Sequence, residues 1–589
     1  MRRILALIAV LCMCVTLLAG CGERETSSLP APETTSAAGE STQTQTTSPS
    51  ETIADSILET SPTEDMASAE EEQIASLENA TIKNPYTFPL VEEATTVTMW
   101  CDLIPPLFNY MPNGMADNLV LQELQSLTGI TLEITSTAIT SASDTVSLMI
   151  ASGAFPEIWS GFGTYYAGSI SEAIEEELLL DLAEYKAYFP SFFQIIDTYD
   201  TYGKNAYTDN ANIGVLNGIW TNPKLDVGLT LRKDYLDELG LDIPTTLDGF
   251  YQALTLMNEN YGATYYMNQD SSDPVNAFAQ CFGVVGNANS SSTYAYYMAK
   301  DGTEVLYSPT QERFRDYLET MAQWYSEGLI YADFLSCADS IPATDVLLSG
   351  SIGITYYNAA SYTTLMNQVD ADSPFELYPV EVPVDTETGE PVHLGRQVDY
   401  TSVKGYSLST ALEPDTEKFE AVCAMLDYLY TDEGSELCNY GVAGTTYTYD
   451  SDGNHVWTDL MTNNPNGLAY SWCLNCYTIG AGSFRIDSSR TLDNYGDAEM
   501  NMISVWNDTE NDAADALPAS ALSLTSDESA AFSAAFSDIR THTQQNILAF
   551  ITGTRPMEEF DTFVEEIQSM DIAGCTEILQ GALDRYNQR

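Results

Sequence analysis

Gly-Leu-Thr-Leu-Arg-Lys-Asp-Tyr-Leu-Asp-Glu-Leu-Gly, residues 228–240, is the stretch that decides the fold. It predicts a strand that runs directly into a helix. Gly240 stands where that helix ends, because glycine readily adopts the left-handed conformation of helix C-caps. Ile243-Pro-Thr-Thr follows, and Thr245 or Thr246 is placed to cap the next helix.

The chain before this stretch alternates strands with helices. The expected elements are a strand at 94–100, a helix at 118–127, a strand at 130–134, a helix at 144–153 and a strand at 155–159. This alternation is typical of a parallel sheet covered by helices. Ligands of such sheets bind beyond the carboxyl ends of the strands. Trp100 and Trp159 both fall at those ends.

Other patterns predict single elements. We expect a helix at 171–182, a hairpin at 207–220 and a helix at 311–327. Residues 450–454 look like the start of a calcium loop, but Met461 occupies the place of the bidentate glutamate. A hairpin turn is therefore expected there.

The first residues predict export and lipid attachment. A basic start, an apolar run from Ile4 to Leu18 and small residues before Cys21 make a secretory signal. The run is too short for a spanning helix, and Leu-Ala-Gly-Cys resembles the lipobox of bacterial lipoproteins, which implies lipidation of Cys21. An ordinary signal with an incidental cysteine, or an uncleaved anchor, are the alternatives. Residues 21–85 lack aromatics and are rich in Ser, Thr and Glu, so we expect a solvated tether.

Composition restricts the ligand. With 86 acidic against 21 basic residues, the formal net charge is −65. Such a surface repels phosphate backbones and anionic headgroups, so nucleic acid is excluded and only the lipid would hold the protein at the membrane. The scattered basic residues form no pocket for a uronate or phosphate.

Eight of the 11 cysteines remain after the signal and Cys21 are set aside. Cys473 and Cys476 are the only close pair, in an aromatic stretch that we expect to be a loop. A redox motif would need a strand-to-helix context, and a zinc site would need two further ligands. Free or locally bridged structural thiols are the favoured interpretation.

The search for catalytic signatures finds no Gly-x-Ser-x-Gly elbow, His-Glu-x-x-His motif or Walker loop. Only three histidines are present. We therefore predict no catalytic residue, no metal site and no cofactor.

Aromatic residues give the better signal for function. Trp and Tyr faces suit the C–H face of a pyranose, while carboxylates and amides bind its hydroxyls. From their places at strand ends and in loops, the sequence predicts ligand contacts by Trp100, Asp102, Trp159, Tyr165 and Trp472.

Five short motifs, in order, carry a resemblance that covers about residues 95 to 589. They are the Arg232-Lys-Asp strand with its Pro-Thr-Thr helix, Ala-Ser-Gly-Ala-Phe-Pro-Glu-Ile at 151–158, the stretch 429–447 ending in Tyr-Gly-Val-Ala-Gly-Thr-Thr-Tyr, Phe-Ile-Thr-Gly at 550–553 and Ala-Leu-Asp-Arg-Tyr at 582–586. The chain resembles the family 1 extracellular solute-binding proteins of bacterial ABC importers, the LplA-like lipoproteins. It departs from them at Ala154 and Glu157, which replace aspartates, and it lacks their calcium loop after the Pro-Thr-Thr helix.

The resemblance implies an α/β protein with the type II periplasmic-binding fold, two lobes joined by a hinge and a helical C-terminal section. The implied division is a signal peptide at 1–20, a tether at 21–85, a first lobe at 86–226 and 403–450, and a second lobe at 227–402 and 451–589. It also implies ligand contacts by Tyr356 and Tyr357 and a structural or interlobe ion pair for Arg232, with ligand contact as the alternative.

The implied function is that of a monomeric, lipid-anchored extracellular receptor. It would capture a neutral oligosaccharide by hinge closure and deliver it to an ABC permease. A surface polysaccharide-degrading enzyme and a sugar-presenting sensor subunit are the alternatives.

Overall fold

The computed structural model describes residues 77, 80–267, 277–286, 294–337, 341–370, 372–390, 401–480, 482–507, 516–519 and 521–589. All of them belong to one compact unit, Gln73–Arg589. The predicted signal peptide, Cys21 and nearly all of the predicted tether lie outside the described residues.

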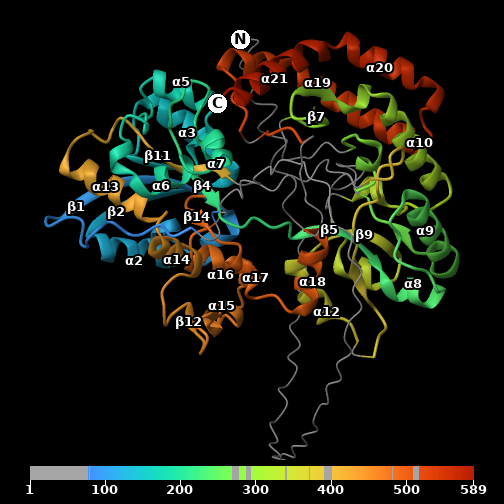
Figure 1. The fold of residues 1–589 in the computed structure, drawn as a ribbon, viewed down its shortest axis with the longest axis horizontal. Helices are drawn as coiled ribbons and strands as arrows, with labels where there is room; N and C mark the ends of the chain where they lie inside the picture. The colour runs from blue at the N-terminus through green and yellow to red at the C-terminus, as the bar shows by residue number, and fades with distance from the viewer. Residues whose placement is uncertain are drawn as a thin grey trace, which may run out of the picture. The chain divides into compact units, whose positions relative to one another are not determined.

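The first lobe is built on a sheet with the strand order β14-β4-β11-β3-β1-β2 among the described residues (Figure 1). Its strands are β1 (Thr95–Leu103), β2 (Ile130–Ala138), β3 (Ile158–Ser160), β4 (Leu216–Trp220), β11 (Thr401–Leu408) and β14 (Arg485–Ile486). β1 pairs in parallel with both β2 and β3, which confirms the parallel core predicted from the alternation. β11 returns from the second lobe and runs antiparallel between β3 and β4.

Several helices of the first lobe begin and end near the residues predicted from the sequence. They are α2 (Leu119–Thr128), α3 (Ala142–Ser152), α4 (Phe162–Tyr165), α5 (Ile170–Glu175), α6 (Pro190–Ile196), α7 (Asp200–Ala206), α13 (Glu417–Tyr428) and α14 (Asp432–Tyr440). Gly129 and Gly153 end α2 and α3 with φ of 79° and 68°. Both adopt the left-handed C-cap conformation that glycine favours.

A buried carboxylate ties the first ordered residues to this lobe. Asp427 accepts hydrogen bonds from the backbone N–H groups of Ser191 and Phe192, at 3.1 and 2.9 Å, and from the Tyr86 hydroxyl at 2.7 Å. The two amides belong to the first turn of α6, where helical N–H groups lack intrahelical partners. Asp427 therefore caps α6 from α13.

The second lobe is built on a sheet with the strand order β10-β5-β9-β6 in the described part of the chain. Its strands are β5 (Val227–Arg232), β6 (Thr264–Tyr265), β9 (Ile352–Asn358) and β10 (Leu377–Pro379). β5 continues into α8 (Lys233–Leu239), which Gly240 ends at φ 69°. Arg232 pairs with Asp234 at 2.6 Å, with both side chains only 6% exposed, and stacks on Tyr235. Its role is thus a structural ion pair within the lobe.

Helices and a small hairpin complete the second lobe and share its core. They are α9 (Leu247–Tyr261), α10 (Glu312–Ser326), α11 (Thr344–Leu348), α12 (Tyr362–Met366), α18 (Asp497–Trp506), α19 (Ser526–Ile551), α20 (Phe560–Ser569) and α21 (Ile572–Asn587), with β7 (Tyr297–Lys300) and β8 (Glu304–Tyr307). Phe314 and Trp324 of α10 lie in one buried cluster with Phe536 of α19, Phe563 of α20 and Leu579 of α21. The C-terminal helices therefore share the buried core of the second lobe.

The segment after residue 450 differs from the prediction. β12 (Tyr447–Tyr449) and β13 (His455–Trp457) form the expected hairpin. β14, however, pairs with β4 of the first sheet, and Trp457 lies in one apolar cluster with Leu103 of β1. The chain thus stays with the first lobe through β14, whereas the predicted division places 451–589 in the second, because apolar residues of this segment pack against the end of β1 and β14 pairs with β4.

Three local predictions also need correction. The helix expected at 171–182 ends at Glu175, and residues 207–220 contain β4 alone in place of a hairpin. The expected loop around Cys473 is α16 (Tyr470–Tyr477). Partners distant in the sequence accompany each outcome: Leu179 pairs with Ser409, β4 pairs with β11, and α16 packs on α2 as well as on the preceding α15 (Asp459–Thr462).

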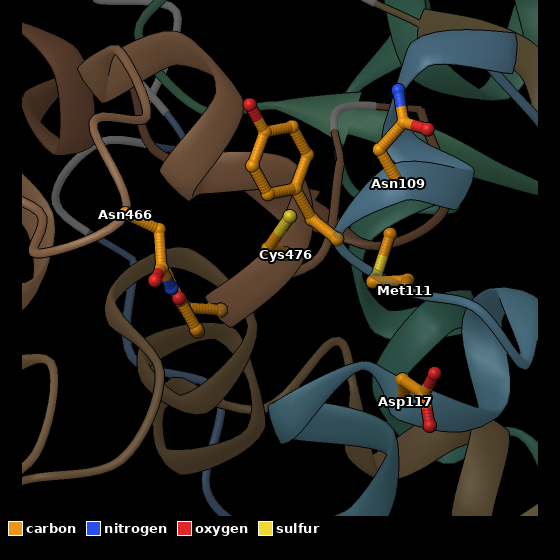
Figure 2. A pocket seen from close by; sticks show the side chains of 7 residues that line it. Asn109, Met111, Asp117, Asn466 and Cys476 are labelled. Carbon is orange, nitrogen blue, oxygen red and sulfur yellow. The ribbon is translucent and has the colours of Figure 1, made fainter.

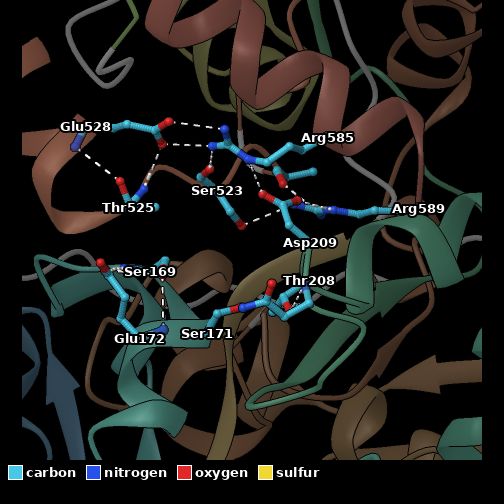
Figure 3. Close-up of polar contacts among 12 residues, drawn as sticks. Ser169, Ser171, Glu172, Thr208, Asp209, Ser523, Thr525, Glu528, Arg585 and Arg589 are labelled. Atoms are coloured by element: carbon cyan, nitrogen blue, oxygen red, sulfur yellow. Dashed lines mark hydrogen bonds and ion pairs between the residues drawn. The ribbon is translucent and has the colours of Figure 1, made fainter.

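The C-terminal helices also contact the first lobe through polar groups. Ser526, at the start of α19, donates to Glu172 of α5 from its backbone N–H at 2.6 Å and from its hydroxyl at 2.8 Å. Tyr586 of α21 donates to Asn205 of α7 at 2.9 Å. Figure 3 shows the neighbouring group around Asp209 and Arg585. These bonds join segments more than 350 residues apart in sequence.

Candidate functional site at the carboxyl end of the first sheet

An ion pair lies at the carboxyl end of the first sheet. Lys404 Nζ of β11 is 2.9 Å from Asp102 Oδ2 of β1. The Asp102 side chain is 3% exposed and that of Lys404 is 38% exposed, so the ammonium group faces solvent while the carboxylate is covered. Gly161, with φ 87°, follows β3, and a Cβ there would lie 3.5 and 3.6 Å from these two side chains. Three strand ends thus converge on one polar group.

Tyr165 extends this group. It lies on α4, one turn after Gly161, and its ring packs 5.8 Å from that of Trp100. Burial and the Asp102 carboxylate hold the pKa of Tyr165 well above its usual value. The single O–H of Tyr165 is directed at the Asp102 carboxylate, which leaves the phenol oxygen as an acceptor, while the Lys404 ammonium group has further N–H donors. The arrangement is suited to hydroxyl groups of a ligand.

Trp100 and Trp159 lie underneath this surface. They are 0% and 1% exposed and pack 5.7 Å apart. Trp100 Nε1 donates to Thr137 Oγ1 at 3.0 Å. Trp159 Nε1 is buried without a hydrogen-bond partner among the described residues. Both indoles are beneath the surface in this conformation, and we assign them the role of supporting Tyr165 and Asp102.

Tyr356 and Tyr357 of the second lobe differ in orientation and in burial. Tyr356 and Tyr357 are neighbours in β9, so their side chains point to opposite faces of the sheet. Tyr357 is 3% exposed, and its hydroxyl donates to the Ser361 carbonyl at 3.4 Å. Tyr356 is half-buried. Tyr356 therefore remains the candidate for ligand contact, while Tyr357 belongs to the core of its lobe.

Trp472 stands apart from the other predicted residues. It lies on α16, is half-buried, and its ring is 6.3 Å from Tyr110 in an edge-to-face arrangement. Beside this pair is a pocket of about 340 Å3 (Figure 2). Its lining is formed by Asn109, Tyr110, Met111, Asp117, Asn466, Cys476 and Tyr477.

Sequence reasoning missed Lys404 and the pocket. The place of Lys404 opposite Asp102 depends on the antiparallel insertion of β11 between β3 and β4. Residues 109–111 lie in the connection that follows β1, so their position beyond a strand end is a usable signal. The partners from 466–477 could not be inferred, because nothing local links them to β1.

The thiols at Cys473 and Cys476 lie in buried surroundings. Both are free and buried, as are Cys101, Cys423, Cys438 and Cys575. Burial raises the pKa of Cys473, and it raises that of Cys476 to about 11. A thiol with a raised pKa is a poor nucleophile at neutral pH, which favours the structural interpretation. No group of three or more metal-binding side chains occurs in the described residues.

Comparisons with known proteins agree with the fold described above. Lipoprotein LipO of Bacillus subtilis (strain 168) is 24% identical over 366 residues, 59% of this chain and 67% of LipO. An HMO-binding, ABC-transporter-associated solute-binding protein of Bifidobacterium longum infantis has a TM-score of 0.68 at 16% identity, over 84% of this chain and 99% of that protein. The alginate-binding protein AlgQ2, without calcium ion, has a TM-score of 0.62 at 18% identity, with coverages of 84% and 99%. No family model matches the sequence.

The protein therefore has the fold of the solute-binding proteins of ABC importers, two α/β lobes followed by a helical C-terminal section. The likeness drawn from the sequence motifs is confirmed. These structural neighbours are named as binding proteins and not as enzymes. In the described part of the chain, no helix has the length and apolar character needed to cross a membrane.

Proposed function

We propose that this protein is a lipid-anchored extracellular receptor that binds a neutral oligosaccharide between its lobes and delivers it to an ABC permease. The single observation that supports this most is the polar group of Asp102, Lys404 and Tyr165 at the carboxyl end of a sheet with the solute-binding-protein fold. In open α/β sheets this edge is where ligands bind.

The charges favour a neutral ligand. Asp102 and Lys404 offset each other at the site, and the chain carries a formal net charge of −65. An anionic sugar would be repelled by the surrounding surface at long range. A neutral sugar avoids this repulsion and still finds charged hydrogen-bond partners, which are stronger than neutral ones.

The hinge provides the mechanism of capture. The chain crosses between the lobes after β4, before β11 and once more after β14, so the two sheets are joined by a few connecting segments. Ligand contacts from both lobes, with Asp102 and Lys404 on one and Tyr356 on the other, would stabilise a closed state. The permease would recognise that state.

Attachment through Cys21 explains the acidic tether. The 65 residues at 21–85 would keep the receptor near the permease and so raise its effective concentration there. Two acyl chains on Cys21 would hold the protein at the membrane without a basic patch.

A thermal-shift panel tests the ligand class. Neutral gluco-, galacto-, manno- and fructo-oligosaccharides are compared with oligouronates at equal concentration. A ligand at 100 times its Kd stabilises by about 2.7 kcal/mol, so we expect a clear rise in Tm with at least one neutral series. A rise with oligouronates alone would contradict the proposal.

A further inference from the structure

The pocket beside Trp472 is built by three segments of the first lobe. The 3-10 helix η2 (Pro105–Asn109) follows β1, the 3-10 helix η3 (Gly114–Asp117) follows it, and α16 closes the other side. Its floor is apolar and firm, since Met111 and Cys476 are 2% and 4% exposed. At about 340 Å3 it lies at the lower end of ligand pockets, about 300–1,000 Å3.

The walls of the pocket offer both hydrogen-bond donors and hydrogen-bond acceptors. Asn109 and Asn466 are exposed, and no side-chain hydrogen bond of either is found among the described residues. Figure 2 shows both carboxamides beside the pocket. Asp117 is held in place by Asn113, whose backbone and side-chain N–H groups donate to it at 2.8 and 2.9 Å. The pocket thus presents amide donors, amide acceptors and a fixed carboxylate.

Aromatic surface lies at the rim. Tyr110 is 43% exposed although it is a large aromatic residue, and it meets the half-buried Trp472 edge to face at 6.3 Å. Aromatic faces next to amides and a carboxylate match a sugar ring, which has apolar C–H faces and a polar edge of hydroxyls.

Other ligand chemistries fit less well. The lining contains no lysine or arginine, so a phosphate or sulfate would find no opposite charge. It contains one carboxylate, fewer than a calcium ion needs. A purely apolar ligand would leave the two carboxamides without partners, which costs free energy.

The buried side of the pocket packs against the end of β1. Leu103, the residue after Asp102, lies in the same apolar cluster as Met111 and Cys476. Because successive residues of a strand point to opposite faces of the sheet, the side chains of Asp102 and Leu103 lie on opposite faces at the end of β1.

We propose that this pocket is a second saccharide subsite, which holds the distal sugar unit of an oligosaccharide whose proximal units lie at Asp102 and Lys404. The inference rests on the proposed function and adds a ligand-length requirement to it. Asn109, Asn466 and Asp117 bind the hydroxyls of that unit, and Tyr110 covers its apolar face.

Calorimetric titration of the full chain tests the subsite. The probes are the neutral oligosaccharide series that raises Tm, from disaccharide to hexasaccharide. The variant is Asn109→Ala/Asn466→Ala, and the control is Asn260→Ala, an exposed asparagine of α9 in the other lobe. We expect the double variant to lose at least tenfold in affinity for the longer members and to bind the disaccharide like the wild type.

The outcomes separate this inference from the proposed function. A uniform loss over all lengths, or no loss, contradicts the subsite while saccharide binding itself stands. If the wild-type protein binds no member of any series, the proposed function itself is contradicted. Hydroxyl-radical footprinting gives a second measurement: the longer members protect Tyr110 and Trp472, the disaccharide does not, and equal labelling in every case contradicts the subsite.

Discussion

Arg585, near the end of α21, donates from Nε to Oδ2 of Asp209 at 2.8 Å, across 376 residues of sequence (Figure 3). Arg589 binds Oδ1 of the same carboxylate, with its Nε at 2.8 Å. Asp209 belongs to the loop before β4 in the first lobe, whereas both arginines belong to the second. One carboxylate thus joins the C-terminus to the other lobe, away from the connecting segments.

Loss of this carboxylate is expected to loosen the lobes. Arg589 is 4% exposed and Asp209 15% exposed, and removing one partner of a buried pair costs about 3–5 kcal/mol. We expect Asp209→Ala to lower the apparent Tm by several degrees and to broaden the interlobe distance distribution measured by single-molecule energy transfer. Asp316→Asn, at an exposed position of α10, serves as control. An unchanged distance distribution in Asp209→Ala would show that the contact does not restrain the lobes.

The contact of Glu172 with Ser526 is expected to persist over the neutral range. Burial raises the pKa of Glu172, but hydrogen bonds from Ser526 and Ser169 together lower it. A lowered folded-state pKa gives stability that is present above the unfolded value of about 4.3 and lost as pH falls through the folded pKa. Interlobe energy transfer should therefore be constant from pH 8 to 5 and change only in stronger acid. A change centred near pH 6.5 would point to a histidine, and Glu172→Gln should remove the acid response.

Asp102→Asn tests the proposed first-lobe contact. The amide keeps the shape of the carboxylate but removes the charged acceptor and the partner of Lys404. Hydrogen bonds to charged groups contribute about 1.5–3 kcal/mol, so we expect saccharide affinity to fall roughly ten- to a hundredfold by calorimetry. Asp117→Asn, in the pocket, should weaken only the longer ligands. An Asp102→Asn protein with wild-type affinity for all lengths would rule out Asp102 as a contact.

Substitution of Trp100 is expected to lower thermal stability, whereas substitution of Tyr165 is expected to weaken ligand binding. Trp100 is fully buried, and Trp→Ala in a core costs about 3–5 kcal/mol, so Trp100→Ala should lower Tm strongly. Tyr165→Phe keeps the ring that packs on Trp100 and removes the hydroxyl beside Asp102, so it should weaken binding with little change in Tm. The reverse pattern would place the ligand at Trp100.

Cys21→Ser tests the anchor. The variant, expressed in a Gram-positive host, should move from the membrane fraction to the medium, because the tether and the acidic surface give no other attachment. The wild-type chain should remain with the membrane. A variant that stays in the membrane fraction would favour an uncleaved anchor.

How much the sequence predicts depends on whether an element is specified locally. Nearby residues specify the strand and helix of residues 228–240, with their end at Gly240, and the hairpin at 450–454, and the structure confirms these elements. The burial of a single tryptophan, in contrast, is not specified by nearby residues. Trp100 follows the ligand-binding pattern by position, but its burial depends on Trp159 and Thr137, which the fold brings to it.

The features that the sequence does not predict depend on partners distant in the chain. Lys404 reaches Asp102 only because β11 inserts between β3 and β4. The pocket needs residues 109–117 and 466–477 together, and the assignment of 451–486 to the first lobe follows from the pairing of β14 with β4. None of these contacts has a local sequence signal.

The most direct measurement of the central claim is a calorimetric titration of the purified chain with the neutral oligosaccharides, followed by chromatography of the recovered sugar. The account predicts saturable one-to-one binding, a loss of affinity in Asp102→Asn, and sugar recovered intact. Absence of binding by every neutral series, or recovery of shortened products that a single carboxylate substitution abolishes, would contradict it.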